Sequence, residues 1–204
     1  QVHPNDEYAK KYENDTGKTE CWYILDAKKD ASLICGIKDN LNKEKLENII
    51  KNNELEENIK RIKVKKGDMI YIPSGTVHAI EDGIELLEIQ QSSDITYRLY
   101  DWGRERELHI DKSLEVIDYN NLGGKIENFK KLSTPYFNVE KISIINSFDD
   151  ESNDIFHVYT VIEGHGKIMY DNTCIDLIKY DTIYIKENTR YSIVGNLEII
   201  KIYL

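Results

Sequence analysis

Cysteine is scarce in this chain: Cys21, Cys35 and Cys174 are the only three in 204 residues, and no two form a Cys-x-x-Cys pair. The scarcity excludes a disulfide-based scaffold, and the missing pairs exclude a zinc ribbon. Scattered cysteines are typical of a reducing compartment, so we expect a cytoplasmic protein. No apolar run approaches the roughly 20 residues that a membrane span needs, and no signal peptide opens the sequence, so no membrane partner is expected.

Positive charge is also in short supply. Lys and Arg total 27 against 37 for Asp and Glu, which gives a formal net charge of −10. This balance argues against nucleic acid as a partner, although a local cationic pocket can still bind a small anion. With 40% hydrophobic and 31% charged residues, the composition is that of a globular protein, and the length suits one large β domain or two small barrels.

What the chain has in abundance is tyrosine, with 14 residues, and short β-branched or aromatic runs between turn signals. These runs predict a mostly β protein. Candidate strands cover residues 21–26, 32–36, 61–65, 68–73, 84–91 and 96–101 and, after a break, residues 137–145, 155–163, 167–171, 175–178, 182–185, 191–194 and 197–203. Helical stretches over 5–12 and 42–52 interrupt them, and Asn42 suits the second as an N-cap. Many short strands at this spacing indicate a sandwich or barrel.

The segment 120–134 contains Asn-Asn-Leu-Gly-Gly and mixed polar residues, which are typical of a linker. It predicts a first domain over residues 1–119 and a second over residues 135–204. The two halves share a pattern, because residues 66–73 match residues 179–186 at five of eight positions, an offset of 113. A degenerate duplication explains this match better than coincidence.

The strongest motif is Gly-Asp-Met-Ile-Tyr-Ile-Pro-Ser-Gly-Thr-Val-His at residues 67–78, which resembles the G-x5-P-x-G-x2-H motif of cupin barrels. The apolar run before Pro73 predicts a buried strand, and Pro73 ends it because proline has no N–H to donate. Gly75 permits a tight turn with positive φ. His78 then begins the next strand, with its ring toward the interior. The alternative interpretation of a lone histidine at this position is a hydrogen-bonded core residue.

Other metal-binding side chains lie near the start of the chain. Gln1 and His3 alternate along an extended segment, so they face the same side. Glu20 heads the apolar run Cys-Trp-Tyr-Ile-Leu, where a buried carboxylate needs a partner or a metal; the alternative is a surface residue at a strand end. Together with His78, these residues offer two imidazoles, a carboxylate and an amide oxygen, a suitable set for one divalent cation with room for substrate.

Several segments together resemble the bacterial short form of class I mannose-6-phosphate isomerase. They are Gln-Val-His-Pro-Asn-Asp at 1–6, Gly-Lys-Thr-Glu-Cys-Trp-Tyr at 17–23, Pro-Ser-Gly-Thr-Val-His-Ala at 73–79, the run from Glu88 to Asp101, and Arg-Glu-Leu-His-Ile at 106–110. The resemblance is dense over residues 1–115 and thin beyond. It implies a mostly β, double cupin fold of jelly-roll barrels with short helical insertions. It also implies metal-dependent interconversion of mannose 6-phosphate and fructose 6-phosphate.

The resemblance further implies roles for individual residues. The family's metal ligands, which hold one Zn²⁺ or another divalent metal per chain, fall on Gln1, His3, Glu20 and His78. Its active-site arginine falls on Arg98, and further pocket positions fall on Lys18, Glu88 and Asp94. The implied partner is a small-molecule sugar phosphate. The family has an N-terminal portion ahead of Gln1, and the opening without Met fits a fragment or a processed chain.

Three of these residues suggest chemistry in their own right. Isomerisation moves a proton between neighbouring carbons through an enediol, so it needs acid–base groups and charge stabilisation. The apolar run around Glu88 predicts a buried strand, where a carboxylate suits acid–base work or a structural ion pair. Arg98 keeps its proton, so it suits charge stabilisation or phosphate binding. For Lys18 three roles are open: it contacts the substrate, it pairs with Glu20, or it lies in an exposed loop.

The second half is predicted to have lost any metal site. Tyr191 occupies the position of His78 at the offset of 113, and superposing Tyr23 on Tyr159 puts Phe156 in the position of Glu20. We therefore expect a structural or interface module there.

Two other functions fit the same residues. An Fe(II) dioxygenase also uses two histidines and a carboxylate, with positions open for O₂. A non-catalytic sugar-phosphate-binding module would bind metal and ligand without turnover. The pair of Arg98 and Lys18 favours an anionic substrate and hence the isomerase.

Overall fold

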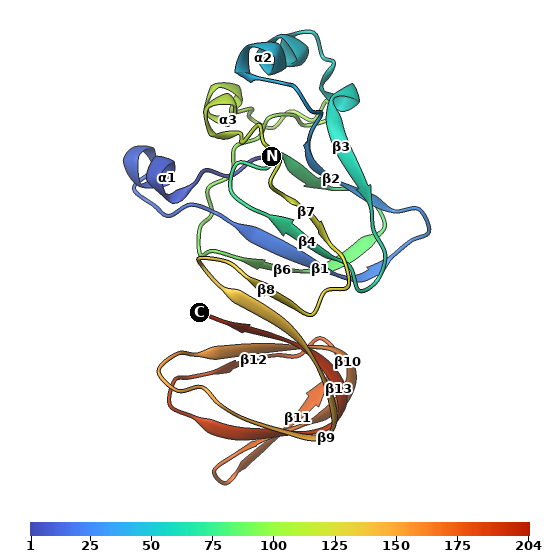
Figure 1. Cartoon of the computed structure of the whole chain (residues 1–204), viewed down its shortest axis with the longest axis vertical. Helices are drawn as coiled ribbons and strands as arrows, with labels where there is room; N and C mark the ends of the chain where they lie inside the picture. The colour runs from blue at the N-terminus through green and yellow to red at the C-terminus, as the bar shows by residue number, and fades with distance from the viewer. The chain divides into compact units, whose positions relative to one another are not determined.

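The computed structural model describes residues 1–204, which form two compact units, Gln1–Asn128 and Phe129–Leu204 (Figure 1). The boundary falls inside the segment 120–134 that the sequence predicts to be a linker. Two short strands lie in that segment: β7 (Gly124–Ile126) pairs with β4 of the first unit, and β8 (Lys131–Ser133) pairs with β9 of the second. Each end of the segment is therefore held in a sheet of its own unit.

Two antiparallel sheets form the first unit, with strand orders β6-β1-β4-β7 and β3-β2-β5. The strands are β1 (Glu20–Ala27), β2 (Ser32–Ile37), β3 (Ile59–Lys63), β4 (Met69–Ile72), β5 (His78–Ile80) and β6 (Ile84–Gln90). Their inward side chains meet in an apolar cluster that contains Trp22, Leu33 and Ile70, all fully buried. Burial of an aliphatic side chain such as Leu33 or Ile70 contributes about 1.5–3 kcal/mol, so this interior holds the two sheets together.

Short helices accompany these sheets, namely α1 (Asp6–Tyr12), α2 (Lys43–Lys51), a 3₁₀ turn (Leu55–Glu57) and α3 (Ile110–Val116). Asn5 caps α1 and Asn42 caps α2, because each side-chain oxygen accepts a backbone N–H three residues on at 2.9 Å. These caps explain why the sequence predicts both helices within a residue of their ends.

Helix α3 is absent from the sequence prediction. Its N-cap, His109, makes no capping hydrogen bond, so the usual start signal is missing. The helix is stabilised by packing instead: Leu114 lies in an apolar cluster with Leu46 of α2 and with Val2 and Val77. Tertiary contacts therefore decide the conformation of residues 110–116.

Two predictions for the first unit are wrong. Residues 96–101 form no strand, and an isolated bridge joins Tyr97 to Val2. β6 lies at the edge of its sheet instead of being buried on both faces. Glu88 is consequently not an interior carboxylate, because its side chain is 35% exposed.

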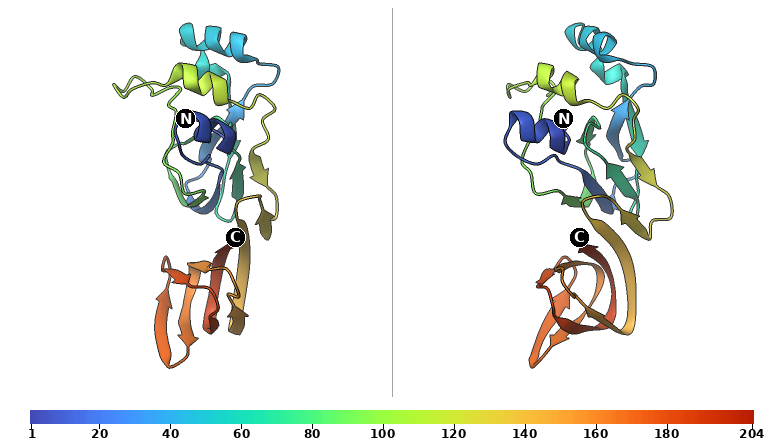
Figure 2. Two further views of the ribbon diagram at one scale, coloured as in Figure 1. Left: turned by 90° about the vertical axis from the view of Figure 1, so that its left-hand side faces the viewer. Right: turned by 60° about the vertical axis from the view of Figure 1, so that its left-hand side comes forward.

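The second unit is an antiparallel sheet that curls around its own core (Figures 1 and 2). Its strand order is β11-β10-β13-β9-β8, with β12 pairing to β10. Besides β8, the strands are β9 (Asn138–Glu151), β10 (His157–Tyr170), β11 (Thr173–Ile178), β12 (Thr182–Ile185) and β13 (Arg190–Tyr203). The core includes Tyr159, Val161, Ile193 and Ile199, all fully buried.

β10 and β13 are each one long strand where the sequence predicts two. The predicted breaks contain glycine, which usually signals a turn. Here Gly166 pairs with Gly195 across the two strands, and a Cβ on either would lie 2.4–2.6 Å from the partner strand's backbone. These glycines therefore permit close approach of two continuous strands.

The internal repeat is visible in the strand bounds. β4 and β12 are related by the same offset of 113, from 69 to 182 and from 72 to 185. β1 pairs Glu20 with Ile72, and β10 pairs His157 with Ile185. His157, not Phe156, therefore occupies the position of Glu20, and the predicted superposition of Tyr23 on Tyr159 is wrong by one residue.

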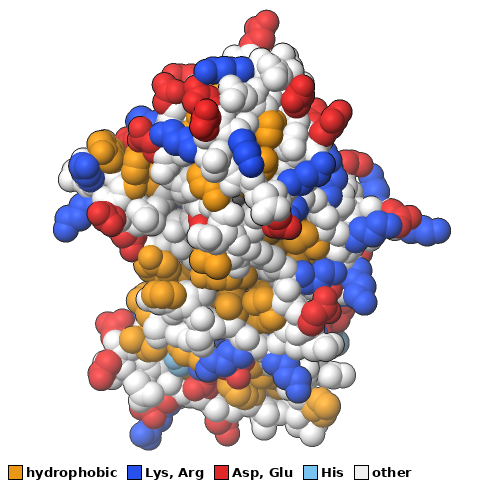
Figure 3. Space-filling view, turned by 45° about the horizontal axis from the view of Figure 1, so that its top comes forward, with side chains coloured by type: hydrophobic (Ala, Val, Ile, Leu, Met, Phe, Trp, Pro, Cys, Tyr) orange, Lys and Arg blue, Asp and Glu red, His pale blue; other side chains and the backbone are white.

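The predicted fold class, mostly β with short helices, is confirmed. None of the helices has the length and apolar character needed to cross a membrane. Acidic and basic side chains are interspersed over the face seen in Figure 3.

Candidate functional site

Backbone pairing fixes the first residues of the chain. Gln1 and His78 exchange two backbone hydrogen bonds, of 3.1 and 2.9 Å, and Val2 does the same with Tyr97 at 2.9 and 3.0 Å. The carbonyl of His3 accepts the backbone N–H of Gly75 at 2.8 Å. This pairing places the side chains of Gln1 and His3 on one side, as their alternation predicts.

The predicted motif places His78 as expected. Gly75 has a φ of +86°, and a Cβ there would lie 2.9 Å from backbone atoms of residues 116 and 118. Only glycine tolerates this turn without strain, and it delivers His78 to the first position of β5. Glu20 stands at the first position of β1, opposite Ile72 at the end of β4.

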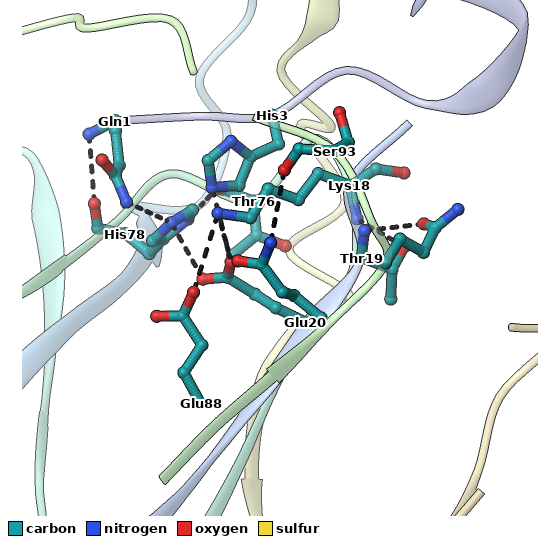
Figure 4. Close-up of polar contacts among 12 residues, drawn as sticks. Gln1, His3, Lys18, Thr19, Glu20, Thr76, His78, Glu88 and Ser93 are labelled. Carbon is teal, nitrogen blue, oxygen red and sulfur yellow. Dashed lines mark hydrogen bonds and ion pairs between the residues drawn. The ribbon is translucent and has the colours of Figure 1, made fainter. Parts of the chain in front are cut away.

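His3, Glu20 and His78 converge in the interior (Figure 4). Their ligand atoms all lie within 4.8 Å of one another, and none of the three residues is more than 1% exposed. Nε2 of His78 lies 3.2 Å from one carboxylate oxygen of Glu20, and Nε2 of His3 lies 3.5 Å from the other. Residues distant in sequence thus meet at one point.

The tautomers of both histidines are set by backbone carbonyls. Nδ1–H of His3 donates to the carbonyl of Ile95 at 2.7 Å, and Nδ1–H of His78 donates to that of Thr76 at 2.8 Å. Each ring therefore turns the lone pair of Nε2 toward Glu20. Orientation of this kind is what a metal-binding histidine requires.

Three of these inward atoms lack hydrogen-bond partners. They are Nε2 of His3 and both carboxylate oxygens of Glu20. Such buried atoms are costly unless a ligand satisfies them. Ligand atoms around a tetrahedral Zn²⁺ at 2.0–2.1 Å lie roughly 3.3 Å apart, close to the 3.2 and 3.5 Å between each imidazole nitrogen and its nearer carboxylate oxygen. The residues present therefore fit a divalent cation.

The charges suit a cation as well. Burial alone would raise the pKa of Glu20, but His3, His78 and Lys18 together lower it to about 2. Burial lowers the pKa of His78 to about 3 despite the carboxylate beside it. The cluster therefore presents an ionised carboxylate and a neutral imidazole at pH 7.

Gln1 lies beside the cluster. Its amide Nε2 is 3.0 Å from Nε2 of His78, and it donates to that lone pair. A 180° flip of the Gln1 side-chain amide would put its oxygen, in place of Nε2, beside Nε2 of His78.

Lys18 and Glu88 form the rim of the cluster. Lys18 Nζ lies 3.2 Å from Glu20 and 3.7 Å from Glu88, and its side chain is only 10% exposed. Lys18 is thus not an exposed loop residue. The indole N–H of Trp22 donates to Glu88 at 3.1 Å, and the Trp22 ring packs edge-on against His78 at 5.4 Å.

The other two predicted residues do not contact the cluster. Arg98 donates to the carbonyl of Glu107 at 3.0 Å and lies 4.0 Å from Asp101. Asp94 is exposed at the surface.

Sequence reasoning missed the contacts of Trp22 with Glu88 and His78. Its spacing of two from Glu20 on β1, which puts both side chains on one face, was the available signal. The orienting carbonyls of Ile95 and Thr76 leave no signal in side-chain identity. His109 serves as the N-cap of α3 and accepts the backbone N–H of Arg98 at 3.2 Å.

Comparisons with known proteins identify relatives of this chain. No family model matches the chain. Mannose-6-phosphate isomerase ManA of Bacillus subtilis is 45% identical over 186 residues, covering 83% of this chain and 59% of the relative. The mannose-6-phosphate isomerase of Streptococcus mutans is 36% identical, covering 98% of this chain and 68% of the relative. The chain thus spans about three fifths of the length of the Bacillus subtilis relative.

Solved structures give the same result. The mannose 6-phosphate isomerase of Bacillus subtilis superposes with a TM-score of 0.89 at 34% identity, covering all of this chain and 70% of that one. A mannose 6-phosphate isomerase bound with zinc and yttrium shares the fold, with a TM-score of 0.73 at 13% identity over 99% of this chain and 75% of that one. On sequence and structure together, the chain belongs to the mannose-6-phosphate isomerase family.

Proposed function

We propose that this protein is a metal-dependent aldose–ketose isomerase that interconverts mannose 6-phosphate and fructose 6-phosphate. The observation that carries the proposal is the buried group of His3, Glu20 and His78, in which Nε2 of His3 and both carboxylate oxygens of Glu20 make no hydrogen bond. The identity of 36–45% to proteins named for this reaction supports the choice of substrate.

The metal would be held by His3, Glu20 and His78, with Gln1 as a fourth ligand through its amide oxygen. Two imidazoles and a carboxylate are a suitable set for Zn²⁺, and a related fold has been solved with zinc bound. One such ion per chain, when bound, supplies Lewis-acid polarisation of the sugar's carbonyl and hydroxyl oxygens.

The protein's own residues then handle the proton and the anion. The Glu88 carboxylate at the rim would take the proton from one sugar carbon and return it to the next. The Lys18 ammonium, between Glu20 and Glu88, would hold a substrate hydroxyl and offset the negative charge nearby. Arg98 would stabilise charge on the substrate or bind its phosphate, and Asp94 would contact the sugar phosphate.

Two alternatives use the same ligand set. An Fe(II) dioxygenase employs two histidines and one carboxylate. A binding module would hold metal and sugar phosphate without turnover. The buried Lys18 beside Glu20 favours an anionic, oxygen-rich substrate over O₂ chemistry, and the named relatives favour catalysis over binding.

The thiols support a cytoplasmic location. Cys21 and Cys35 are buried and free, and burial raises their pKa values to about 12 and about 11. Cys174 is free and exposed. An exposed thiol persists where glutathione keeps it reduced, so we place the protein in the cytoplasm.

A coupled assay tests the function. The full-length polypeptide, loaded with Zn²⁺, should convert mannose 6-phosphate to fructose 6-phosphate, and a chelator should abolish the conversion. Oxygen consumption, measured in parallel with Fe²⁺ loaded, should be absent. Metal-loaded protein that binds mannose 6-phosphate but never turns it over would leave only the binding module.

A further inference from the structure

Trp22 is tied to the rim of the site as well as to the core. Its side chain is fully buried between the sheets, in the apolar cluster that includes Ile70 and Leu33. Its indole N–H, the ring's only polar group, reaches out of that cluster to Oε2 of Glu88 at 3.1 Å. β1 and β6 place Trp22 directly opposite Glu88 in the pairing register.

This hydrogen bond settles the orientation of a carboxylate that little else restrains. Glu88 lies on an edge strand, and its side chain is 35% exposed, so several rotamers are open to it. With Oε2 held by the indole, Oε1 faces Lys18 at 3.7 Å. Lys18 in turn lies 3.2 Å from Glu20 (Figure 4).

Trp22 is itself held rigidly. The edge of its ring packs against the ring of His78 at 5.4 Å, with an interplanar angle of 76°. A fully buried ring between two sheets has a single rotamer available. The direction of its N–H is therefore fixed by the same core that fixes His78.

We propose that Trp22 is a positioning residue for catalysis: its indole N–H holds the Glu88 carboxylate in the orientation in which it faces Lys18 and exchanges the proton of the isomerisation. This inference rests on the proposed function. In this role Trp22 acts through Glu88 and takes no part in the proton transfer itself.

A double-mutant cycle measures this role in the metal-loaded, full-length polypeptide. Trp22→Phe removes the N–H and keeps an aromatic ring in the core. We expect kcat to fall roughly tenfold with KM and metal content unchanged, because a misplaced proton-transfer group loses rate and not binding. In a Glu88→Gln background, Trp22→Phe should cause little further loss, since both changes act on one carboxylate.

The matched control is Ile70→Val. Ile70 pairs with Trp22 across β1 and β4 and shares its cluster, so the change loosens the same packing and leaves the indole hydrogen bond intact. It should lower the melting temperature with kcat nearly unchanged. Equal losses of kcat in Trp22→Phe and Ile70→Val would assign Trp22 to packing alone and overturn the proposal.

A spectroscopic measurement separates the contact from the turnover. The chain has two tryptophans, Trp22 and Trp102, so its ¹H–¹⁵N spectrum has two indole signals. Glu88→Gln should move the Trp22 signal upfield, because a neutral acceptor replaces a charged one, and should leave that of Trp102 in place. Glu85→Gln, an exposed position on the same strand, should move neither.

The outcomes are distinguishable. An unmoved Trp22 signal in Glu88→Gln contradicts the hydrogen bond, and additive losses in the cycle contradict the positioning role, each with isomerase activity intact. Absence of isomerase activity in the unsubstituted, metal-loaded protein contradicts the proposed function and this inference together.

Discussion

The interiors of the two units treat equivalent positions in opposite ways. Glu20 and Trp22 on β1 pair with β4, and β12 is the strand that corresponds to β4 at the offset of 113. His157 and Tyr159 on β10 pair with β12 and therefore occupy the equivalent positions. In the first unit the Trp22 N–H donates to Glu88, whereas both carboxylate oxygens of Glu20 make no hydrogen bond. In the second unit the polar atoms hydrogen-bond to one another.

The second network is closed. The hydroxyl of Tyr191, at the position of His78, lies 2.6 Å from both Nδ1 of His157 and the hydroxyl of Tyr159. Asp150 accepts hydrogen bonds from Tyr159 at 2.6 Å, Tyr191 at 3.1 Å and Lys201 at 2.5 Å. Every charge and hydroxyl in this group has a partner within the chain.

This difference in hydrogen bonding distinguishes the candidate metal site of the first unit from the structural network of the second. Buried polar groups must be satisfied, either by each other or by something that binds. The second unit uses tyrosine hydroxyls, which donate and accept, so its polar groups satisfy one another. In the first unit two imidazole lone pairs and a carboxylate face one another with Lys18 at the rim, and such a group of acceptors suits a cation.

The largest expected effect comes from removing one acceptor. His78→Ala should lower metal affinity by more than about 100-fold and abolish isomerase activity, because the ion loses a direct ligand. Tyr191→Phe, at the equivalent position of the second unit, should leave the metal in place. Metal content after dialysis, measured by mass spectrometry, checks both, and full metal content in His78→Ala would contradict the assignment.

Arg98→Ala should separate metal binding from catalysis. We expect kcat/KM to fall about 10²–10³-fold with metal content retained, because a guanidinium stabilises charge that develops on the substrate. Arg190→Ala, an arginine of the second unit paired to Glu151 and largely exposed, should change neither quantity. Loss of the metal from Arg98→Ala would instead make the arginine part of the site's scaffold.

Tyr159→Phe should weaken the closed network. It removes a hydroxyl that is 2.6 Å from both Asp150 and Tyr191, so we expect a loss of about 1–3 kcal/mol in the free energy of unfolding. Metal binding in the first unit should not change. Urea denaturation of the whole chain measures the loss, with Tyr184→Phe, an exposed tyrosine, as the control. Equal stability of the two variants would mean that the network contributes nothing.

The sequence predicts the parts of the site that depend on local geometry. The turn at Gly75 and the alternation of Gln1 and His3 are short-range features, and the structure has both. The exposure of Glu88 depends on which strands flank β6, and an apolar run cannot distinguish an edge from a centre.

The one-residue error at Phe156 has a similar origin. Matching tyrosines set the superposition in the sequence, but pairing to β4 and β12 sets it in the structure. A shift of one residue exchanges the two faces of a strand, so the sequence match selects Phe156 in place of the inward His157. For this reason the sequence does not predict the polar network of the second unit.

The smallest expected effect is a pH dependence of that network. Burial lowers the pKa of His157, Lys201 adds to the lowering, and Asp150 opposes it. Below the ordinary histidine pKa of 6.5, the unfolded chain therefore binds a proton that the folded chain does not, and stability falls as pH falls. The carboxyl of Asp150 does not contribute in this window, since its pKa is lowered from 3.8.

His157→Gln isolates this contribution. The melting temperature should fall more for the unsubstituted protein than for His157→Gln between about pH 7.5 and about pH 5.5, because only the former has this histidine to protonate on unfolding. His78, whose pKa burial also lowers, is present in both proteins and cancels from the comparison. Parallel pH profiles would mean that His157 has the same pKa in the folded and unfolded chains. They would contradict the expectation that burial in the hydrogen-bonded network keeps His157 unprotonated.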